Sequence, residues 1–474
     1  GKRRVGRMRP VGRLQHRAAA GDERCIYVKG SVEAITSRCA AAMTDAGDTT
    51  DVDADAVQRA AAELAAKGLR VLAFARRAVG AEQSALSHDD VAGELVFLGL
   101  QGMVDPPRPE AVSAVAACHA AGIAVKMITG DHPATAAAIA AELRLSDDPD
   151  APPPVLTGRE LQALSGEELA DRVERIHVFA RVTPEQKLRL VDAVQSHGHI
   201  VAMTGDGVND APALRKADIG VAMGITGTEV AKDAADMVLT DDNFASIEAA
   251  VEEGRCVFDN LTKFIVWTLP TNAGEGLVIL AAVLLMMDLP ILPVQILWVN
   301  MTTALLLGLM LAFEPREPGL MQRPPRDPRV PLLTPMLLMR IATVGVLLFV
   351  AALALFKWQL SQGVSEEAAR TMAVNVFVFG ELFYLFNCRS LTRSMFAIGI
   401  FTNLRMLLGV TAMVLLQLLF TYWAPMQRLF HSAALDAKAW LAIIGVGVAI
   451  WLIIELEKRL TRRLLRAELR QRRG

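Results

Sequence analysis

The sequence predicts a mixed α/β part followed by an all-α bundle of six membrane-spanning helices. From about residue 95 to residue 240, short strand-like apolar runs alternate with alanine-rich helical stretches, which is typical of a parallel, doubly wound sheet. After about residue 255, long apolar runs dominate the 474-residue chain, of which 53% is hydrophobic. We divide the chain into residues 1–102, 103–254 and 255–474.

The net charge, the cysteines and the N-terminal residues argue against several classes of protein. The formal net charge is -2, so the total charge implies neither an acidic nor a basic partner, and we expect no nucleic-acid partner. The five cysteines form no CxxC pair, which argues against a disulfide framework and against a thiolate metal site. The basic residues 1–17 precede no apolar stretch and are therefore no secretory signal. Because the chain begins without Met and in mid-pattern, we expect a fragment of a longer protein.

The expected strands of the parallel sheet are five short apolar runs. In such sheets, ligands bind beyond the carboxyl ends of the strands, so motifs at these ends are the candidate site residues. The runs are ELVFLGL at 94–100, IAVKMIT at 123–129, RIHVFAR at 175–181, HIVAMT at 199–204 and DIGVAM at 218–223.

Two of the strand-end motifs suit a phosphate group. Thr129, Gly130 and Asp131 follow one strand, where a hydroxyl and an unhindered backbone N–H could hold a phosphoryl oxygen at the start of a helix. In ARVTPEQK, Thr183 and Pro184 begin a helix that presents Lys187, whose charge suits a transferring phosphate.

The third motif, MTGDGVNDAPAL, places carboxylates on a loop with little bulk. Asp206 follows its strand directly between two glycines, and Asn209 and Asp210 come shortly after it. Glycines let a carboxylate approach a compact ligand, and such oxygen ligands suit Mg²⁺. A plain Asp–Gly turn is the alternative. Two TGD tripeptides at strand ends, together with the lysine, favour phosphate and Mg²⁺ chemistry.

Six apolar stretches after residue 255 are long enough to cross a membrane, since about 20 residues span its hydrocarbon core. Arginine and lysine gather in segments 313–335 and 389–403 and in the C-terminal tail. This distribution places those segments, the tail and the N-terminal half in the cytosol. The expected spans are 264–287, 291–312, 336–356, 371–388, 404–424 and 438–456.

Polar residues interrupt three of these spans. Pro270 and Gly274 would free backbone carbonyls in the first span, as in the broken helices of transporters. Carboxylates and amides from three spans could form an oxygen-rich site for a hard cation. Interhelical hydrogen bonds that only hold the bundle together are the alternative. The residues are Asn272, Glu275, Asn300, Thr302, Thr303, Asn375 and Glu381.

These motifs resemble the signatures of P-type cation-transporting ATPases from about residue 24 to the end of the chain. The signatures are TGDGVNDAPAL, MITGD, DPPR and KGSVE. LPVQILWVNMTTA and GELFYLFN resemble the sixth and eighth transmembrane segments of the calcium-pump-like branch. The six spans would then be the family's fifth to tenth, and the chain the C-terminal half of a pump.

The resemblance implies a haloacid-dehalogenase-like phosphorylation domain with a partial nucleotide-binding domain, in a multi-pass protein of the plasma membrane. It implies ATP and Mg²⁺ as cofactors, a transported cation, and a missing N-terminal half as partner. By position, Lys29, Gly30 and Arg70 fall on nucleotide-binding residues. Thr129, Gly130, Asp131, Lys187, Asn209 and Asp210 fall on catalytic ones, Asp206 on the Mg²⁺ ligand, and Asn272, Glu275, Asn300, Thr303 and Glu381 on the cation site.

The sequence also departs from the family pattern. No DKTGT occurs, so the phosphorylated aspartate is absent and the chain is expected to be inactive alone. Ala304 stands where calcium pumps carry an aspartate, so Ca²⁺ and another hard cation both stay open. Two alternative functions remain, a membrane-anchored Mg²⁺-dependent phosphohydrolase and a non-catalytic half that assembles with a separate N-terminal half.

Overall fold

The computed structural model describes residues 12–17, 24–67, 69–80, 87–103, 106–146 and 153–471. The chain separates into two compact units, Gly1–Ala249 and Ala250–Gly474. The first unit is mixed α/β with parallel sheets, and the second contains long apolar helices. This arrangement confirms the predicted fold class.

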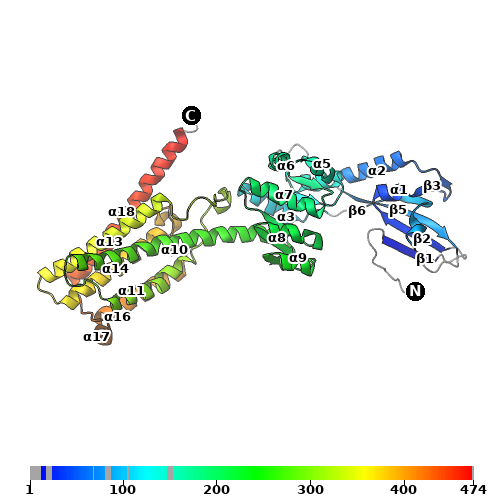
Figure 1. Cartoon of the computed structure of the whole chain (residues 1–474). Helices are drawn as coiled ribbons and strands as arrows, with labels where there is room; N and C mark the ends of the chain where they lie inside the picture. Colours follow the sequence, from blue (N-terminus) through cyan, green and yellow to red (C-terminus); the bar gives the residue numbers. More distant parts are fainter. Residues whose placement is uncertain are drawn as a thin grey trace. The chain divides into compact units, whose positions relative to one another are not determined.

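A six-stranded sheet begins the first unit, with the strand order β1-β2-β5-β6-β3-β4. Its neighbouring strands are antiparallel except for the pair β3 and β6. Alternate residues such as Ile26 and Val28 are buried against helices α1 (Val32–Thr36) and α2 (Ala54–Ala66), as period-two strands require. Figure 1 shows both helices beside this sheet. The strands are β1 (Gly12–Arg17), β2 (Arg24–Gly30), β3 (Cys39–Met43), β4 (Thr49–Thr50), β5 (Arg70–Val79) and β6 (Leu95–Met103).

The first unit also contains two all-parallel, three-stranded sheets, ordered β7-β9-β8 and β10-β11-β12. The expectation of one sheet that includes the run 94–100 is therefore wrong, because that run lies in β6 and pairs antiparallel with β5. Ile128 packs against the apolar clusters of both parallel sheets, so the two sheets are neighbours. The strands are β7 (Met127–Thr129), β8 (Val155–Thr157), β9 (Val178–Ala180), β10 (Ala202–Gly205), β11 (Ile219–Met223) and β12 (Met237–Leu239).

Short helices connect the parallel strands. Several begin with a side-chain cap, for example α7, where Thr183 and Gln186 form a reciprocal capping box and Pro184 takes the first position. The helices are α3 (Pro109–Ala120), α4 (Pro133–Glu142), α5 (Gly158–Ala163), α6 (Gly166–Val173), α7 (Pro184–Ser196), α8 (Ala211–Lys216) and α9 (Glu229–Ala234).

The second unit holds six apolar segments long enough to span a membrane, which confirms the predicted number within the described residues. Helix α14 is the central span. In its most apolar 18-residue stretch 83% of the residues are buried, against 44% or less in the other spans. The segments lie in α10 (Phe244–Leu284), α11 (Pro293–Thr303) with its extension, α13 (Pro335–Ser361), α14 (Glu366–Cys388), α16 (Leu404–Tyr422) and α18 (Ala437–Gln471). The extension of α11 is a π-helical segment, Ala304–Gly308, followed by α12 (Leu309–Leu311).

Helix α10 passes through Pro270 without a break, so the expected broken helix is not present. Proline has no N–H and leaves the carbonyl four residues earlier without its helical donor. That carbonyl belongs to Val266, and it accepts a hydrogen bond from the Tyr384 hydroxyl at 3.2 Å. Pro270 therefore frees a backbone carbonyl as predicted, and the Tyr384 side chain of the neighbouring helix α14 supplies the missing donor.

Candidate functional site

The nucleotide-binding candidates lie on the six-stranded sheet. Lys29 and Gly30 end β2, and Arg70 begins β5, opposite Met103 of β6. The Lys29 side chain is exposed on the face opposite the two helices, since Val28 beside it is buried against them. The side chain of Arg70 lies outside the described part of the structure.

Two aromatic residues that the sequence analysis missed share this open face. Tyr27 precedes Lys29 by two positions on the same strand, and Phe74 pairs directly with Lys29 across β2 and β5. An aromatic surface beside a cation suits a purine with phosphates attached. These residues can be identified only from the pairing register of β2 and β5, which the sequence does not reveal.

The candidates around β10 form one connected group. The Lys187 ammonium on α7 donates to Asp210 Oδ1 at 2.5 Å. Asp210 is buried, and its other oxygen accepts from the backbone N–H of Asp206 at 3.3 Å and of Gly207 at 3.1 Å. Asp210 and Lys187 therefore fix the turn that carries Asp206. Gly205 permits this turn, because a Cβ there would lie 2.5 Å from that of Asp210.

Asp206 and Asn209 are the exposed members of this group. The Asp206 carboxylate accepts no hydrogen bond from any residue that the structure describes, so its oxygens are available to a ligand. It lies at the carboxyl end of β10, where the motif predicts it. No three His, Cys, Asp or Glu side chains gather as a metal site among the described residues. The Asp210 carboxylate of this group is already bonded to Lys187, Asp206 and Gly207.

In the TGD motif at the end of β7, Thr129 and Asp131 form hydrogen bonds with each other. The Thr129 hydroxyl donates to Asp131 at 3.2 Å and accepts from the Asp131 N–H at 3.1 Å. A Cβ at Gly130 would meet no atom within 4 Å, so the backbone is open to a ligand on that side. His132 caps α4 by accepting from Ala134, and burial together with the Arg181 charge lowers the pKa of its imidazole.

A further anchor of the Asp206 loop was missed in the sequence. The Asp206 carbonyl accepts from the Thr228 N–H at 2.8 Å, at the end of the loop that follows β11. Asp242 holds this loop by accepting from the N–H groups of Ile225 at 3.0 Å and Thr226 at 2.8 Å. These backbone bonds, with that of the Thr226 hydroxyl, lower the pKa of Asp242 to about 2. Its role depends on tertiary contacts, which no short motif signals.

The membrane candidates come together on three helices. Glu275 of α10 is 3% exposed, and it accepts from the Asn300 amide of α11 at 2.8 Å. Glu381 of α14 is 2% exposed, and Thr303 lies beside its carboxylate. Glu275 Oε1 and Glu381 Oε2 have no hydrogen-bond partner among the described residues. Two buried carboxylates with free oxygens suit a cation ligand better than a purely structural contact.

Two other polar residues of these spans lie elsewhere. The Asn272 side chain is exposed, so the structure does not bring it to the pair of glutamates. Asn375 is buried, and its amide donates to the Thr371 carbonyl at 2.8 Å and to the Thr421 hydroxyl at 3.3 Å. The bond to Thr421 fits the interhelical alternative, whereas the Asn375 Oδ1 atom is buried without a hydrogen-bond partner among the described residues.

Comparison with known proteins identifies both parts of the chain. Residues 8–110 match the family described as P-type ATPase, cytoplasmic domain N. Residues 288–460 match the family described as cation transporting ATPase, C-terminus.

Curated relatives from several bacteria match most of the chain. The Probable cation-transporting ATPase F of Mycobacterium tuberculosis is 56% identical over 443 residues, 93% of this chain and 49% of the relative. The cation-transporting ATPase pma1 of Synechocystis is 48% identical over 428 residues, 89% of this chain and 47% of the relative. The calcium-transporting ATPase of Bacillus subtilis is 42% identical over 431 residues, 90% of this chain and 48% of the relative.

The chain therefore spans about half the length of the curated relatives that it matches. Its two matched regions agree with the resemblance seen in its motifs. The chain belongs to the P-type cation-transporting ATPases and carries their cytoplasmic domain N and their C-terminal membrane part.

Proposed function

We propose that this chain supplies the nucleotide-binding, phosphate-handling and cation-binding parts of a pump that couples ATP hydrolysis to cation transport through an aspartyl-phosphate. The observation that carries the proposal is the exposed Asp206 carboxylate, which Asp210 and Lys187 position at the end of β10. The same chain buries Glu275 and Glu381 among its membrane helices. Phosphate chemistry and cation binding thus share one polypeptide.

The proposed reaction has two steps. A carboxylate oxygen of an aspartate attacks the γ-phosphorus of ATP, the bond to the ADP oxygen breaks, and water later hydrolyses the acyl phosphate. The attacking aspartate would come from a segment with the DKTGT pattern, which this sequence does not contain. Strands β7 and β10 are edge strands that pair on one side only, with β9 and β11, among the described residues. The backbone groups on their other sides are available to such a segment.

Different residues of this chain would contact the nucleotide and its phosphate groups. Lys29 would hold ATP on the open face of the six-stranded sheet, and Arg70 would be a further nucleotide-binding residue. Thr129 and the Gly130 backbone would receive phosphoryl oxygens, and Lys187 would compensate their negative charge. Asp131 and Asn209 would orient these groups from the neighbouring turn positions.

Asp206 fits a Mg²⁺ ligand, because its carboxylate is exposed and carries no hydrogen bond from the described residues. When bound, Mg²⁺ would neutralise charge on the transferring phosphate. The phosphate and the incoming segment would supply further oxygens. Asp210 would keep the Asp206 turn in place through its two backbone hydrogen bonds.

The transported ion would be a hard cation held by Glu275, Asn300, Thr303 and Glu381. Ca²⁺ takes six to eight oxygen ligands, more than these side chains supply, so the remaining ones would come from other parts of the pump. Ca²⁺ is the first cation to test, since the Bacillus subtilis relative is described as calcium-transporting. Arginines in 313–335 and 389–403 support an orientation with the first unit and the tail cytosolic, and we propose the plasma membrane as the membrane spanned.

Phosphoenzyme formation from radiolabelled ATP tests the proposal. The chain would be joined to an upstream segment with the DKTGT pattern and purified as one protein. We expect acid-stable, hydroxylamine-sensitive label in the joined protein and none in the chain alone. Asp206→Asn should lower the label by at least about tenfold, since a metal ligand would be lost. Full labelling of the chain alone would favour a free-standing phosphohydrolase instead.

A further inference from the structure

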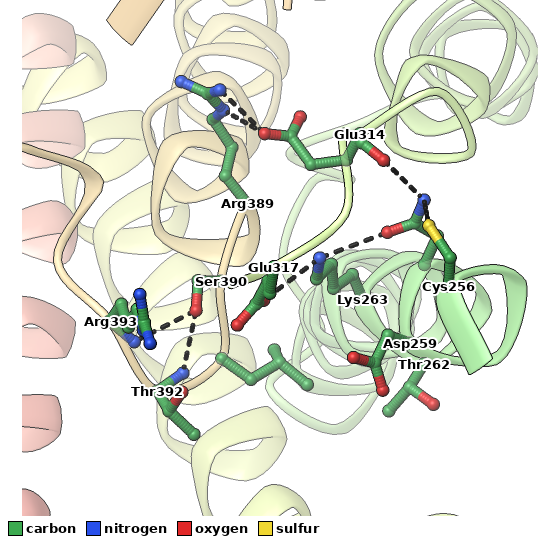
Figure 2. Close-up of polar contacts among 12 residues, drawn as sticks. Cys256, Asp259, Thr262, Lys263, Glu314, Glu317, Arg389, Ser390, Thr392 and Arg393 are labelled. Carbon is green, nitrogen blue, oxygen red and sulfur yellow. Dashed lines mark hydrogen bonds and ion pairs between the residues drawn. The ribbon is translucent and has the colours of Figure 1, made fainter. Parts of the chain in front are cut away.

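A pocket of about 740 Å³ with a mixed polar and apolar lining lies in the second unit, where α10 meets two connections between spans. Residues 258–263 of α10 form one wall, residues 317–323 and Leu332 another, and residues 391–393 the third. Figure 2 shows Thr392 and Arg393 on one side, with Asp259 and Thr262 on the other. All three walls belong to segments that the basic loops place on the cytosolic side.

Buried ion pairs fix the walls of this pocket. Lys263 is 2% exposed, and its ammonium lies 3.2 Å from Glu317 and donates to Asn260 at 3.1 Å. Glu314 and Arg389 precede the second and third wall segments in the chain. They form an ion pair with a 2.8 Å hydrogen bond, drawn in Figure 2, and both side chains are almost fully buried. A pocket with walls fixed in this way loses little entropy when a ligand binds.

One positive charge of the pocket has no carboxylate partner. Three cationic and two acidic side chains line it. Lys263 pairs with Glu317, and Arg323 lies 2.9 Å from Asp259. No carboxylate that the structure describes lies within ion-pair distance of Arg393, whose guanidinium donates to the Pro318 carbonyl at 3.4 Å. The uncompensated guanidinium makes the pocket suitable for an anion.

We propose that this pocket binds the phosphate group of an anionic phosphate ester, with Arg393 as its main cationic contact. The planar guanidinium binds phosphate oxygens in pairs, and the Thr392 hydroxyl and Gln322 amide beside it can donate further hydrogen bonds. Basic pockets at the cytoplasmic ends of membrane helices bind lipid headgroups in this way. The proposal rests on the orientation given above and is independent of ATP hydrolysis.

Native mass spectrometry of the purified chain in neutral detergent tests this site without any pump turnover. Phosphatidylglycerol, phosphatidylcholine and glycerol 3-phosphate are the probes. We expect one phosphatidylglycerol to bind more tightly than phosphatidylcholine. Arg393→Gln should weaken this binding by about tenfold, the effect of losing a hydrogen bond to a charged group. Arg329→Gln is the matched control, because Arg329 is exposed on the 313–335 segment and does not line the pocket.

The outcomes show whether the bound phosphate group belongs to a lipid or to a soluble ester. Tight, Arg393-dependent binding of glycerol 3-phosphate would support the phosphate chemistry and assign the site to a soluble ester. The proposal is overturned if phosphatidylcholine binds as tightly as phosphatidylglycerol, or if neither anionic probe binds. Equal weakening by Arg393→Gln and Arg329→Gln would also overturn it, because the attraction would then come from the general surface charge.

Discussion

Asp210→Ala tests whether the Asp210–Lys187 pair holds the turn of Asp206. The substitution removes a charge-assisted bond from Lys187 and two backbone bonds, from Asp206 and Gly207. Asp210 is 6% exposed, so the lysine and the two N–H groups lose partners in a largely dry site. Breaking such a pair costs about 3 kcal/mol. For a unit of this size, that corresponds to a fall of about 6–12 °C in the melting temperature.

Differential scanning calorimetry of the whole chain in detergent measures this fall. Asp192→Ala is the matched control, since Asp192 lies on the same α7 helix and pairs with Lys216 at a site where the two side chains are 52% and 46% exposed. Exposed pairs of this kind contribute at most about 1 kcal/mol. A melting-temperature change for Asp210→Ala no larger than that for Asp192→Ala would refute the reasoning.

Three further predictions concern other parts of the molecule. The pKa of Asp242 is depressed to about 2, so its stabilising effect is full above the ordinary aspartate pKa and is lost as the pH falls towards 2. Thermal melts from pH 5 to pH 2 should therefore lose stability less steeply in Asp242→Asn than in the wild type, and parallel curves would contradict this. Glu314→Gln should destabilise the second unit by about 3–5 kcal/mol, more than the double variant with Arg389→Met, because it removes the negative charge that faces the buried Arg389 guanidinium; a double variant that melts lower than the single one would argue against it. Lys29→Met should weaken binding of a fluorescent ATP analogue by about tenfold, while Lys67→Met on the α2 end should leave it unchanged; equal affinities in both variants would remove Lys29 from the nucleotide site.

Short motifs predicted much of the candidate site, because a strand end and a helix start are local features. The TGD motifs stand at the ends of β7 and β10, and Thr183 begins α7 with the capping box that presents Lys187. The six spans were visible because apolar length is itself the physical requirement for crossing a membrane.

The remaining features depend on contacts between distant segments. The run 94–100 has the same composition whichever way its neighbour runs, so its antiparallel pairing in β6 was not predictable. Asn272 and Glu275 are three positions apart on one helix, yet only Glu275 is buried, because the packing of α10 decides which side faces the bundle. Asp242 reaches the Asp206 loop only through the fold around β11.

Ion-stimulated ATP hydrolysis by the joined protein tests the central claim most directly, namely that phosphate chemistry at Asp206 is coupled to a cation at Glu275 and Glu381. Ca²⁺, Mn²⁺, Mg²⁺, Na⁺, K⁺ and acid would each be screened with wild type and Glu275→Gln. The account predicts stimulation by one hard cation, abolished by Glu275→Gln, with the ion-independent rate kept. Stimulation that survives in Glu275→Gln at the same ion concentration would contradict it, because the transported cation would then bind elsewhere.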